Sequence, residues 1–167
     1  YRLTEDAEQW ETFETGDARA FAAAVMHGES LYCIGGLSQD GLLSTAVRHE
    51  IIDGQTATRQ LPPLPQPLAL ARAVVYDNTV WVFGGATSLE PLVLNDQIYT
   101  LSLTAPDGQW NSEPAPFPGR ILPVAGMHLR AIFVGGGWAP AKAETEAGDN
   151  DWTAQSDFWR YRTEGSL

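Results

Sequence analysis

Cysteine and basic residues are scarce in this sequence. Cys33 is the single cysteine in 167 residues, so an internal disulfide is excluded. Ten Lys and Arg stand against 21 Asp and Glu, giving a formal net charge of −11. A field of that sign repels nucleic acid and anionic lipid, and no stretch of about 18 apolar residues could form a membrane-spanning helix. We therefore expect neither nucleic acid nor a membrane among the partners.

Helical periodicity is also lacking. No window places apolar residues at helical spacing between plausible caps, and β-branched and aromatic residues fill the apolar runs. The 16 Gly and 11 Pro indicate many turns. With 44% apolar residues, the length fits one domain with a sizeable core. These features predict an all-β fold.

Three apolar runs that close in glycine repeat along the chain. They read LYCIGG (31–36), VWVFGG (80–85) and AIFVGGG (131–137), with Gly35, Gly84 and Gly135 49 and 51 residues apart. A stretch rich in small residues and a short polar break precede each run, which is typical of two strands joined by a tight hairpin. The strands predicted before the runs are 20–25, 69–75 and 122–127.

Two further strands are predicted for each repeat. The third strands are 46–52, 95–103 and 156–162, and the fourth strands are 9–13, 56–61 and 108–113. Trp10, Arg59 and Trp110 are again 49 and 51 residues apart, in agreement with the glycines. Four short antiparallel strands per roughly fifty residues is the spacing of a kelch-type propeller blade.

The repeat divides the chain into blades. We predict the outer strand of a seam blade in 1–16, blades in 17–61 and 62–113, and a blade lacking its outer strand in 114–167. Propellers close with roughly 4–8 blades, so three blades' worth is half of a six-bladed ring. A homodimer, or a missing propeller half, would complete the ring by strand exchange at the seams. The start at Tyr1 rather than Met favours a fragment.

Two segments carry a family resemblance. LPPLPQPLALARAVVYDNTVWVFGG (61–85) and GQWNSEPAPFPGRILPVAG (108–126) resemble the cyclically permuted kelch mutarotases, relatives of bacterial N-acetylneuraminate mutarotase. The resemblance implies a six-bladed, galactose oxidase-like propeller, commonly exported, with the sugar at the mouth of the central channel. A periplasmic or extracellular location is therefore expected. The long acidic loop 138–156 departs from the family pattern.

No catalytic residue is carried over from that family. A glutamate and an arginine are thought to serve the sialic-acid enzyme, but the blade that holds them aligns with no segment of this chain. Mutarotation needs one group to accept the anomeric proton and another to donate to the ring oxygen, without a cofactor. The loops predicted to surround the channel mouth are 14–20, 37–45, 62–70, 86–95, 114–121 and 138–156.

Five residues are candidates for contact with a sugar. Arg120, in PFPGRILP, is placed to bind an anion or hydroxyl, or to form a salt bridge within the protein. Arg19 lies one position from the equivalent place in the first repeat, and Arg72 falls on an inner strand, facing the channel or a neighbouring acid. Trp138 could stack on a sugar or pack over its loop. Glu90 is the acid/base candidate by position alone.

The remaining reactive residue types favour structural roles. Cys33 lies in an apolar run and is expected to be an inert core thiol. The three histidines share no metal-ligand spacing, so no metal site is expected, and Asn95 and Asp96 are expected to close a loop. The sequence thus favours a cofactor-free mutarotase or epimerase (an isomerase) for sialic acid or a related sugar. A non-enzymatic kelch module for protein or glycan, and a carbohydrate oxidase relative, are the alternatives.

Overall fold

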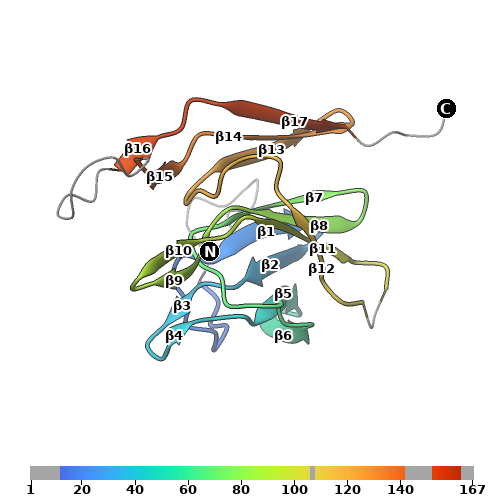
Figure 1. Cartoon of the computed structure of the whole chain (residues 1–167). Coiled ribbons are helices and arrows are strands. Elements are labelled where there is room, and N and C mark those ends of the chain that lie inside the picture. The colour runs from blue at the N-terminus through green and yellow to red at the C-terminus, as the bar shows by residue number, and fades with distance from the viewer. Residues whose placement is uncertain (1–11, 106–107, 142–151, 163–167) are drawn as a thin grey trace.

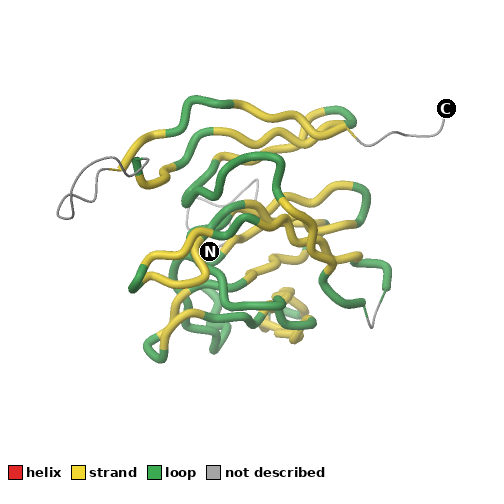
Figure 2. The backbone as a smooth tube through the Cα atoms, viewed as in Figure 1, coloured by secondary structure: helices red, strands yellow, loops and turns green. Residues whose placement is uncertain are grey.

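The computed structural model describes residues 12–105, 108–141 and 152–162. Within these ranges the chain forms β-strands joined by turns and loops, without a helix (Figure 1, Figure 2). No helix in the described ranges is therefore long or apolar enough to cross a membrane.

Three antiparallel sheets carry the fold, and Figure 1 shows them layered in chain order. The first sheet has the order β1-β2-β5-β6, the second β7-β8-β11-β12, and the third β13-β14-β17. Their strands are β1 Ala23–His27, β2 Ser30–Ile34, β5 Ala46–Ile52, β6 Gln55–Leu61, β7 Arg72–Tyr76, β8 Thr79–Phe83, β11 Gln97–Ser102, β12 Asn111–Pro114, β13 Val124–His128, β14 Ala131–Gly135 and β17 Phe158–Arg162. The repeated hairpin plus third strand is confirmed.

Several predicted strand boundaries are wrong by a few residues. The inner strands begin two or three residues later than predicted, and β12 begins at Asn111, after Trp110. Trp110 is instead buried, and its indole Nε1 donates to the Pro62 carbonyl at 2.8 Å. The predicted strand 9–13 lies mostly outside the described residues, with Trp10, and Phe13 is in a loop. The division into blades at the predicted bounds remains a prediction.

The glycine register predicted for the third repeat is also wrong. Strand pairing makes Ile34, Phe83 and Gly135 equivalent, because each pairs with the first residue of its inner strand. The matching glycines are therefore Gly35, Gly84 and Gly136, with φ of 62°, 64° and 61°. Gly135 still belongs to β14. Because AIFVGGG ends in three glycines, the sequence alone did not show which two of them match the glycine pairs of the other repeats.

The core lies between successive sheets. One buried cluster joins the first and second sheets through residues such as Tyr32, Ile34, Val80 and Val82. A second cluster joins the second and third sheets and includes Val74, Phe83, Ile98, Ile132 and Val134. The second sheet is thus covered on both faces, which explains why VWVF is an unbroken apolar run rather than an alternating one. Burying each such side chain contributes about 1.5–3 kcal/mol.

Candidate functional site

Three small hairpins occupy segments that were predicted to be plain loops. They are β3–β4 (Leu37–Ser38, Gly41–Leu42), β9–β10 (Ala86–Leu89, Leu92–Leu94) and β15–β16 (Trp138–Pro140, Trp152–Ala154). All three project from the same end of the molecule (Figure 1). Each is bridged to the segment before an inner strand, through Ala20–Leu37, Ala69–Ala86 and Ile121–Trp138. We call this end, made of the hairpins and residues 20–23, 69–72 and 121–124, the hairpin face.

A line of strained residues lies beside the inner strands on the hairpin face. Phe21, Leu70 and Leu122 occupy equivalent positions and have positive φ of 55°, 61° and 51°. Leu70 N–H donates to Phe21 O at 3.0 Å, and Leu122 N–H donates to Leu70 O at 2.8 Å. Non-glycine residues with this backbone cost energy and persist only where surrounding structure fixes them. Phe21 and Leu122 are 59% and 48% exposed, so they form an apolar rim.

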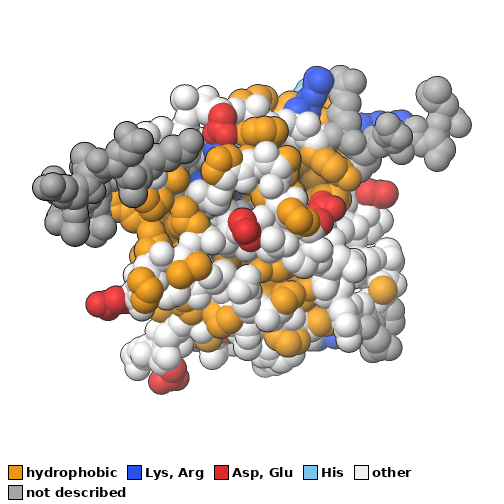
Figure 3. Space-filling view, in the orientation of Figure 1, with side chains coloured by type: hydrophobic (Ala, Val, Ile, Leu, Met, Phe, Trp, Pro, Cys, Tyr) orange, Lys and Arg blue, Asp and Glu red, His pale blue; other side chains and the backbone are white. Residues whose placement is uncertain are grey.

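Arg72, Trp138 and Glu90 all lie at the surface of the hairpin face. Arg72 begins β7 and is exposed, and its Nε donates a long hydrogen bond of 3.4 Å to Pro123 O. Trp138 begins β15 and is 44% exposed. Glu90 is exposed in the turn between β9 and β10. In the space-filling view, the side where the hairpins lie carries hydrophobic side chains, with single acidic residues at its outer edge (Figure 3).

Arg120 is placed inside the protein. Its side chain is 0% exposed, and its guanidinium forms a two-pronged pair with Asp157 at 2.5 and 2.7 Å. Further hydrogen bonds reach Pro118 O at 3.2 Å and Gly136 O at 3.1 Å, and the guanidinium lies 5.1 Å from the Phe117 ring centroid. The geometry therefore assigns Arg120 to holding β17 beside the end of β14. A sugar contact for Arg120 stays a prediction.

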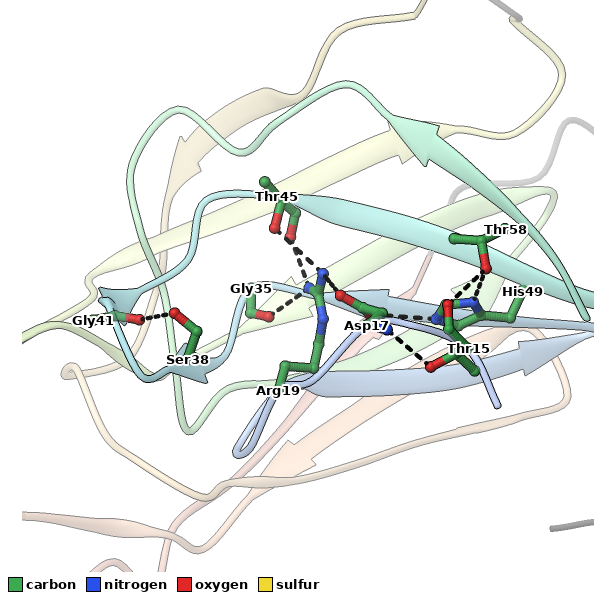
Figure 4. Close-up of polar contacts among 9 residues, drawn as sticks. All are labelled: Thr15, Asp17, Arg19, Gly35, Ser38, Gly41, Thr45, His49 and Thr58. Atoms are coloured by element: carbon green, nitrogen blue, oxygen red, sulfur yellow. Dashed lines mark hydrogen bonds and ion pairs between the residues drawn. The ribbon is translucent and has the colours of Figure 1, made fainter. Parts of the chain in front are cut away.

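Arg19 does the same work in the first sheet. Once the glycine register is corrected, Arg19 is the equivalent of Arg120, not its neighbour. Its guanidinium donates to Gly35 O at 2.8 Å, to Thr45 O at 3.1 Å and to the Asp17 carboxylate at 2.6 Å (Figure 4). Its side chain is only 6% exposed. Arg19 therefore clamps the end of β2 to the start of β5.

In the second sheet, the equivalent glycine carbonyl is bound without an arginine. Leu68 stands at the position of Arg19 and Arg120 and is 1% exposed. In its place the buried Asn95 amide donates to Gly84 O at 3.0 Å and to Gln97 O at 2.7 Å. The expectation of loop closure through side chain to backbone bonds is confirmed for Asn95, whereas the Asp96 carboxylate accepts from the Gln97 side chain at 2.8 Å. In each sheet, one buried side chain thus donates to the carbonyl of Gly35, Gly84 or Gly136, the equivalent glycines that follow β2, β8 and β14.

The Arg120–Asp157 pair predicts a pH dependence. Hydrogen bonding from Arg120 lowers the pKa of Asp157 from its ordinary 3.8 to about 2. Because the folded-state pKa is depressed, the pair contributes its full stability above about pH 4 and loses it as the pH falls through about 2. We expect a carboxyl NMR titration to give a pKa near 2 for Asp157, and a clearly higher pKa in Arg120→Leu. An unchanged pKa in that variant would contradict the pairing.

A second polar cluster pins residues 15–19 to the first sheet. His49 Nε2 lies 3.3 Å from the Asp17 carboxylate, and Nδ1 lies 2.9 Å from Thr58 Oγ1 (Figure 4). Burial raises the pKa of the nearby Cys33 thiol, which favours its unreactive form. No group of three or more His, Cys, Asp or Glu able to hold a metal ion occurs in the described ranges.

Comparison with known proteins supports the fold. No protein-family model matches the chain. Beta-scruin of Limulus polyphemus is 31% identical over 104 residues, which are 59% of this chain and 11% of that protein. The solved structure of YjhT matches with a TM-score of 0.62 at 18% identity, over 75% of this chain and 36% of that one. The matched part of this chain thus corresponds to only a minor part of Beta-scruin and of YjhT.

These likenesses and the sheet order define an all-β fold of the kelch-type β-propeller class, as the sequence predicted. The positive-φ residues Phe21, Leu70 and Leu122 were missed at the sequence level, since none of the three is a residue that commonly adopts positive φ. Their equal distance from the glycine pairs, counted in the corrected register, is the signal that could have revealed them.

Proposed function

We propose that this chain contributes to a sugar-binding kelch propeller and that the hairpin face contacts the sugar. The observation that carries the proposal is the exposed residue Arg72 at the start of the inner strand β7, close to the apolar rim. Arg19 and Arg120, by contrast, have most of their donors bound within the protein. Arg72 is therefore the arginine best placed to meet a ligand on this face.

The ligand class follows from these groups and from the family resemblance. A guanidinium binds a carboxylate through paired charge-assisted hydrogen bonds, so an anionic sugar such as sialic acid suits Arg72. The rim of Phe21 and Leu122 offers apolar surface to the C–H face of a sugar ring. The net charge of −11 opposes an anionic ligand, which makes this local cation more important for its binding.

The proposed reaction is mutarotation by general acid–base catalysis without a cofactor. A base removes the anomeric hydroxyl proton, the bond from the anomeric carbon to the ring oxygen breaks, and an acid protonates the ring oxygen. Reclosure on the other face of the carbonyl reverses these proton transfers. Glu90 is the candidate for one of the two proton-transfer roles, by its place on the hairpin face.

A binding module without catalysis is the second candidate. Among the described residues, no hydrogen bond or ion pair joins Glu90 to a second ionisable group, whereas the reaction needs two groups that transfer protons. An isolated exposed carboxylate on the same face as an apolar rim and one guanidinium suits recognition of a glycan or a protein.

Anomer exchange measured by NMR distinguishes the two. We expect the chain to accelerate exchange of N-acetylneuraminate, and Arg72→Ala to weaken its binding about ten- to a hundredfold by loss of a charge-assisted contact. Neutral hexoses should be unaffected by that change. Arg130→Ala is the matched control, because Arg130 is exposed in the turn between β13 and β14, at the other end of the molecule.

The outcomes separate the candidates. Binding that depends on Arg72 but brings no faster exchange supports the binding module. Equal effects of Arg72→Ala and Arg130→Ala would show that the hairpin face is not the site. Neither binding nor exchange with any sugar would remove the sugar proposal altogether.

A further inference from the structure

The outward face of the third sheet is apolar and open. Val124 and Phe158 on this face are 69% and 68% exposed. The equivalents of Phe158 are Ala46 in the first sheet, at 0%, and Ile98 in the second, at 5%. In those two sheets the following sheet covers the position. Figure 1 shows the third sheet as the outermost layer of the described chain.

A hollow marks this open face. It has a volume of about 450 Å³ and is lined mainly by apolar groups, among them Val124, Met127, Phe133 and Phe158. Phe133 and Phe158 stack with ring centroids 5.4 Å apart. A flat aromatic pair beside Gly126 and Gly136 offers a surface on which a further sheet can pack closely.

Backbone hydrogen bonds join successive sheets in a fixed pattern. At the first junction Gly36 N–H donates to Leu68 O at 2.7 Å, and Leu70 N–H donates to Phe21 O at 3.0 Å. The second junction repeats both bonds one sheet later, from Gly85 N–H to Arg120 O at 2.7 Å and from Leu122 N–H to Leu70 O at 2.8 Å. Each junction therefore uses one donor and one acceptor from each sheet.

The two open ends of the described chain hold the separated halves of this pattern. On the third sheet, Gly137 N–H and Leu122 O are the equivalents of the groups used at the junctions. On the first sheet, Arg19 O and Phe21 N–H are the equivalents. None of these four groups has a hydrogen-bond partner among the described residues. The donor of each end matches the acceptor of the other.

The opposite face of the first sheet is also incompletely covered. Met26 is 59% exposed. Ala24 is also exposed, whereas Ala73, its equivalent in the second sheet, is only 5% exposed. A hollow of about 390 Å³ lies there, lined in part by Met26, Leu31 and Phe13. At each internal junction, the outward face of one sheet meets the opposite face of the next sheet. The third sheet exposes a face of the first kind, and the first sheet exposes a face of the second kind.

We propose that a second copy of this chain packs head to tail on the first, so that two copies close one ring. The third sheet of each copy meets the first sheet of the other, with Gly137 N–H donating to Arg19 O and Phe21 N–H donating to Leu122 O across each contact. A head-to-tail contact that closes gives a finite ring. The matched 75% of the 167 residues makes up 36% of YjhT, so two copies hold about as many residues as that chain.

Sedimentation velocity of the 18.2 kDa chain tests the ring. We expect a species of twice that mass in the micromolar range, and tighter association at higher salt, because salt screens repulsion between two chains of charge −11. Gly136→Ala should weaken the dimer at least about tenfold. A Cβ on Gly35 or Gly84 would lie 2.1 Å from Leu68 O or 2.5 Å from Arg120 O, and one on Gly136 would meet Arg19 O of the second copy in the same way.

Gly28→Ala is the matched control for that variant. Gly28 has φ of 59°, against 61° for Gly136, and neither site has an atom within 4 Å of an added Cβ in the single chain. Both variants should therefore fold with equal loss of stability, while only Gly136→Ala loses the dimer. Equal dimerisation of the two variants would overturn the proposal.

A charge placed on the open face gives an independent test. Phe158→Glu should abolish dimerisation, whereas Leu129→Glu, at an 80% exposed turn residue of the same sheet, should leave it intact. A wild-type chain that stays monomeric throughout the micromolar range, or that forms open-ended oligomers, would overturn the closed two-copy ring.

Discussion

Gly35→Ala is expected to lower the free energy of unfolding by more than about 4 kcal/mol, a loss reserved for specific clashes and buried defects. The added Cβ would lie 2.1 Å from the backbone oxygen of Leu68 and 3.1 Å from its carbonyl carbon. Backbone cannot swing aside as a long side chain does, so the segment before β7 would have to move. That movement would also break the bond from Gly36 N–H to Leu68 O that joins the first two sheets.

The control for this prediction is again Gly28→Ala. Its φ of 59° is close to the 62° of Gly35, and its Cβ would meet nothing within 4 Å. A left-handed backbone costs a non-glycine residue about 1–2 kcal/mol, which is all that Gly28→Ala should lose. Urea unfolding followed by tryptophan fluorescence measures both variants, with m-values compared to exclude a changed unfolded state. Equal midpoints for the two variants would show that the close approach between the sheets carries little energy.

The sequence predicted the sheets because propeller packing leaves a strong local mark. A strand covered on both faces must be apolar at every position, as VWVF is, and the chain must then turn sharply, which requires glycine. An apolar run followed by a glycine pair recurs in each sheet at almost equal spacing. The repeat could therefore be found without any knowledge of contacts between distant residues.

The hairpin face could not be predicted in the same way. The two-residue strands of β3–β4 are held by backbone hydrogen bonds such as Ala20 N–H to Leu37 O at 2.9 Å. Such bonds do not depend on the identity of a side chain, so the sequence pattern does not indicate them. Phe21 and Leu122 adopt positive φ because their backbone groups are fixed by neighbouring sheets, and not because of their own preference. Local propensity carries no information about such positions.

A shift of one residue in the alignment of the third repeat decides whether the sequence reveals the shared role of Arg19 and Arg120. With Gly135 taken as the equivalent of Gly84, Arg19 and Arg120 fall one position apart, and each looks like an isolated loop arginine. With Gly136 in that place they coincide, and an arginine repeated at the same point of two repeats indicates a structural clamp. Their burial, 6% and 0% exposed, agrees with that interpretation.

Removing the partner of the buried guanidinium is the second large effect that we expect. Asp157→Asn should lower the free energy of unfolding by about 3 kcal/mol, the lower end of the cost of leaving one charge of a buried pair uncompensated. Arg120 is 0% exposed, so it cannot recover the loss by turning to water. The lower end applies because the Asp157 side chain is 36% exposed. Urea unfolding at neutral pH measures the loss, which should disappear as the pH falls below about 2.

The second sheet supplies the control, because an uncharged side chain there holds the equivalent glycine carbonyl. Leu68, Asn95 and Gln97 are the equivalents of Arg120, Gln155 and Asp157, so Arg120→Leu, Gln155→Asn and Asp157→Gln together install that uncharged arrangement in the third sheet. Replacing a buried ion pair with well-packed apolar groups is often neutral. The triple variant should thus lose less than about 1.5 kcal/mol, and less than Asp157→Asn alone. A triple variant as unstable as Asp157→Asn would mean that the third sheet needs the ion pair itself, and that the clamps of the second and third sheets are not interchangeable.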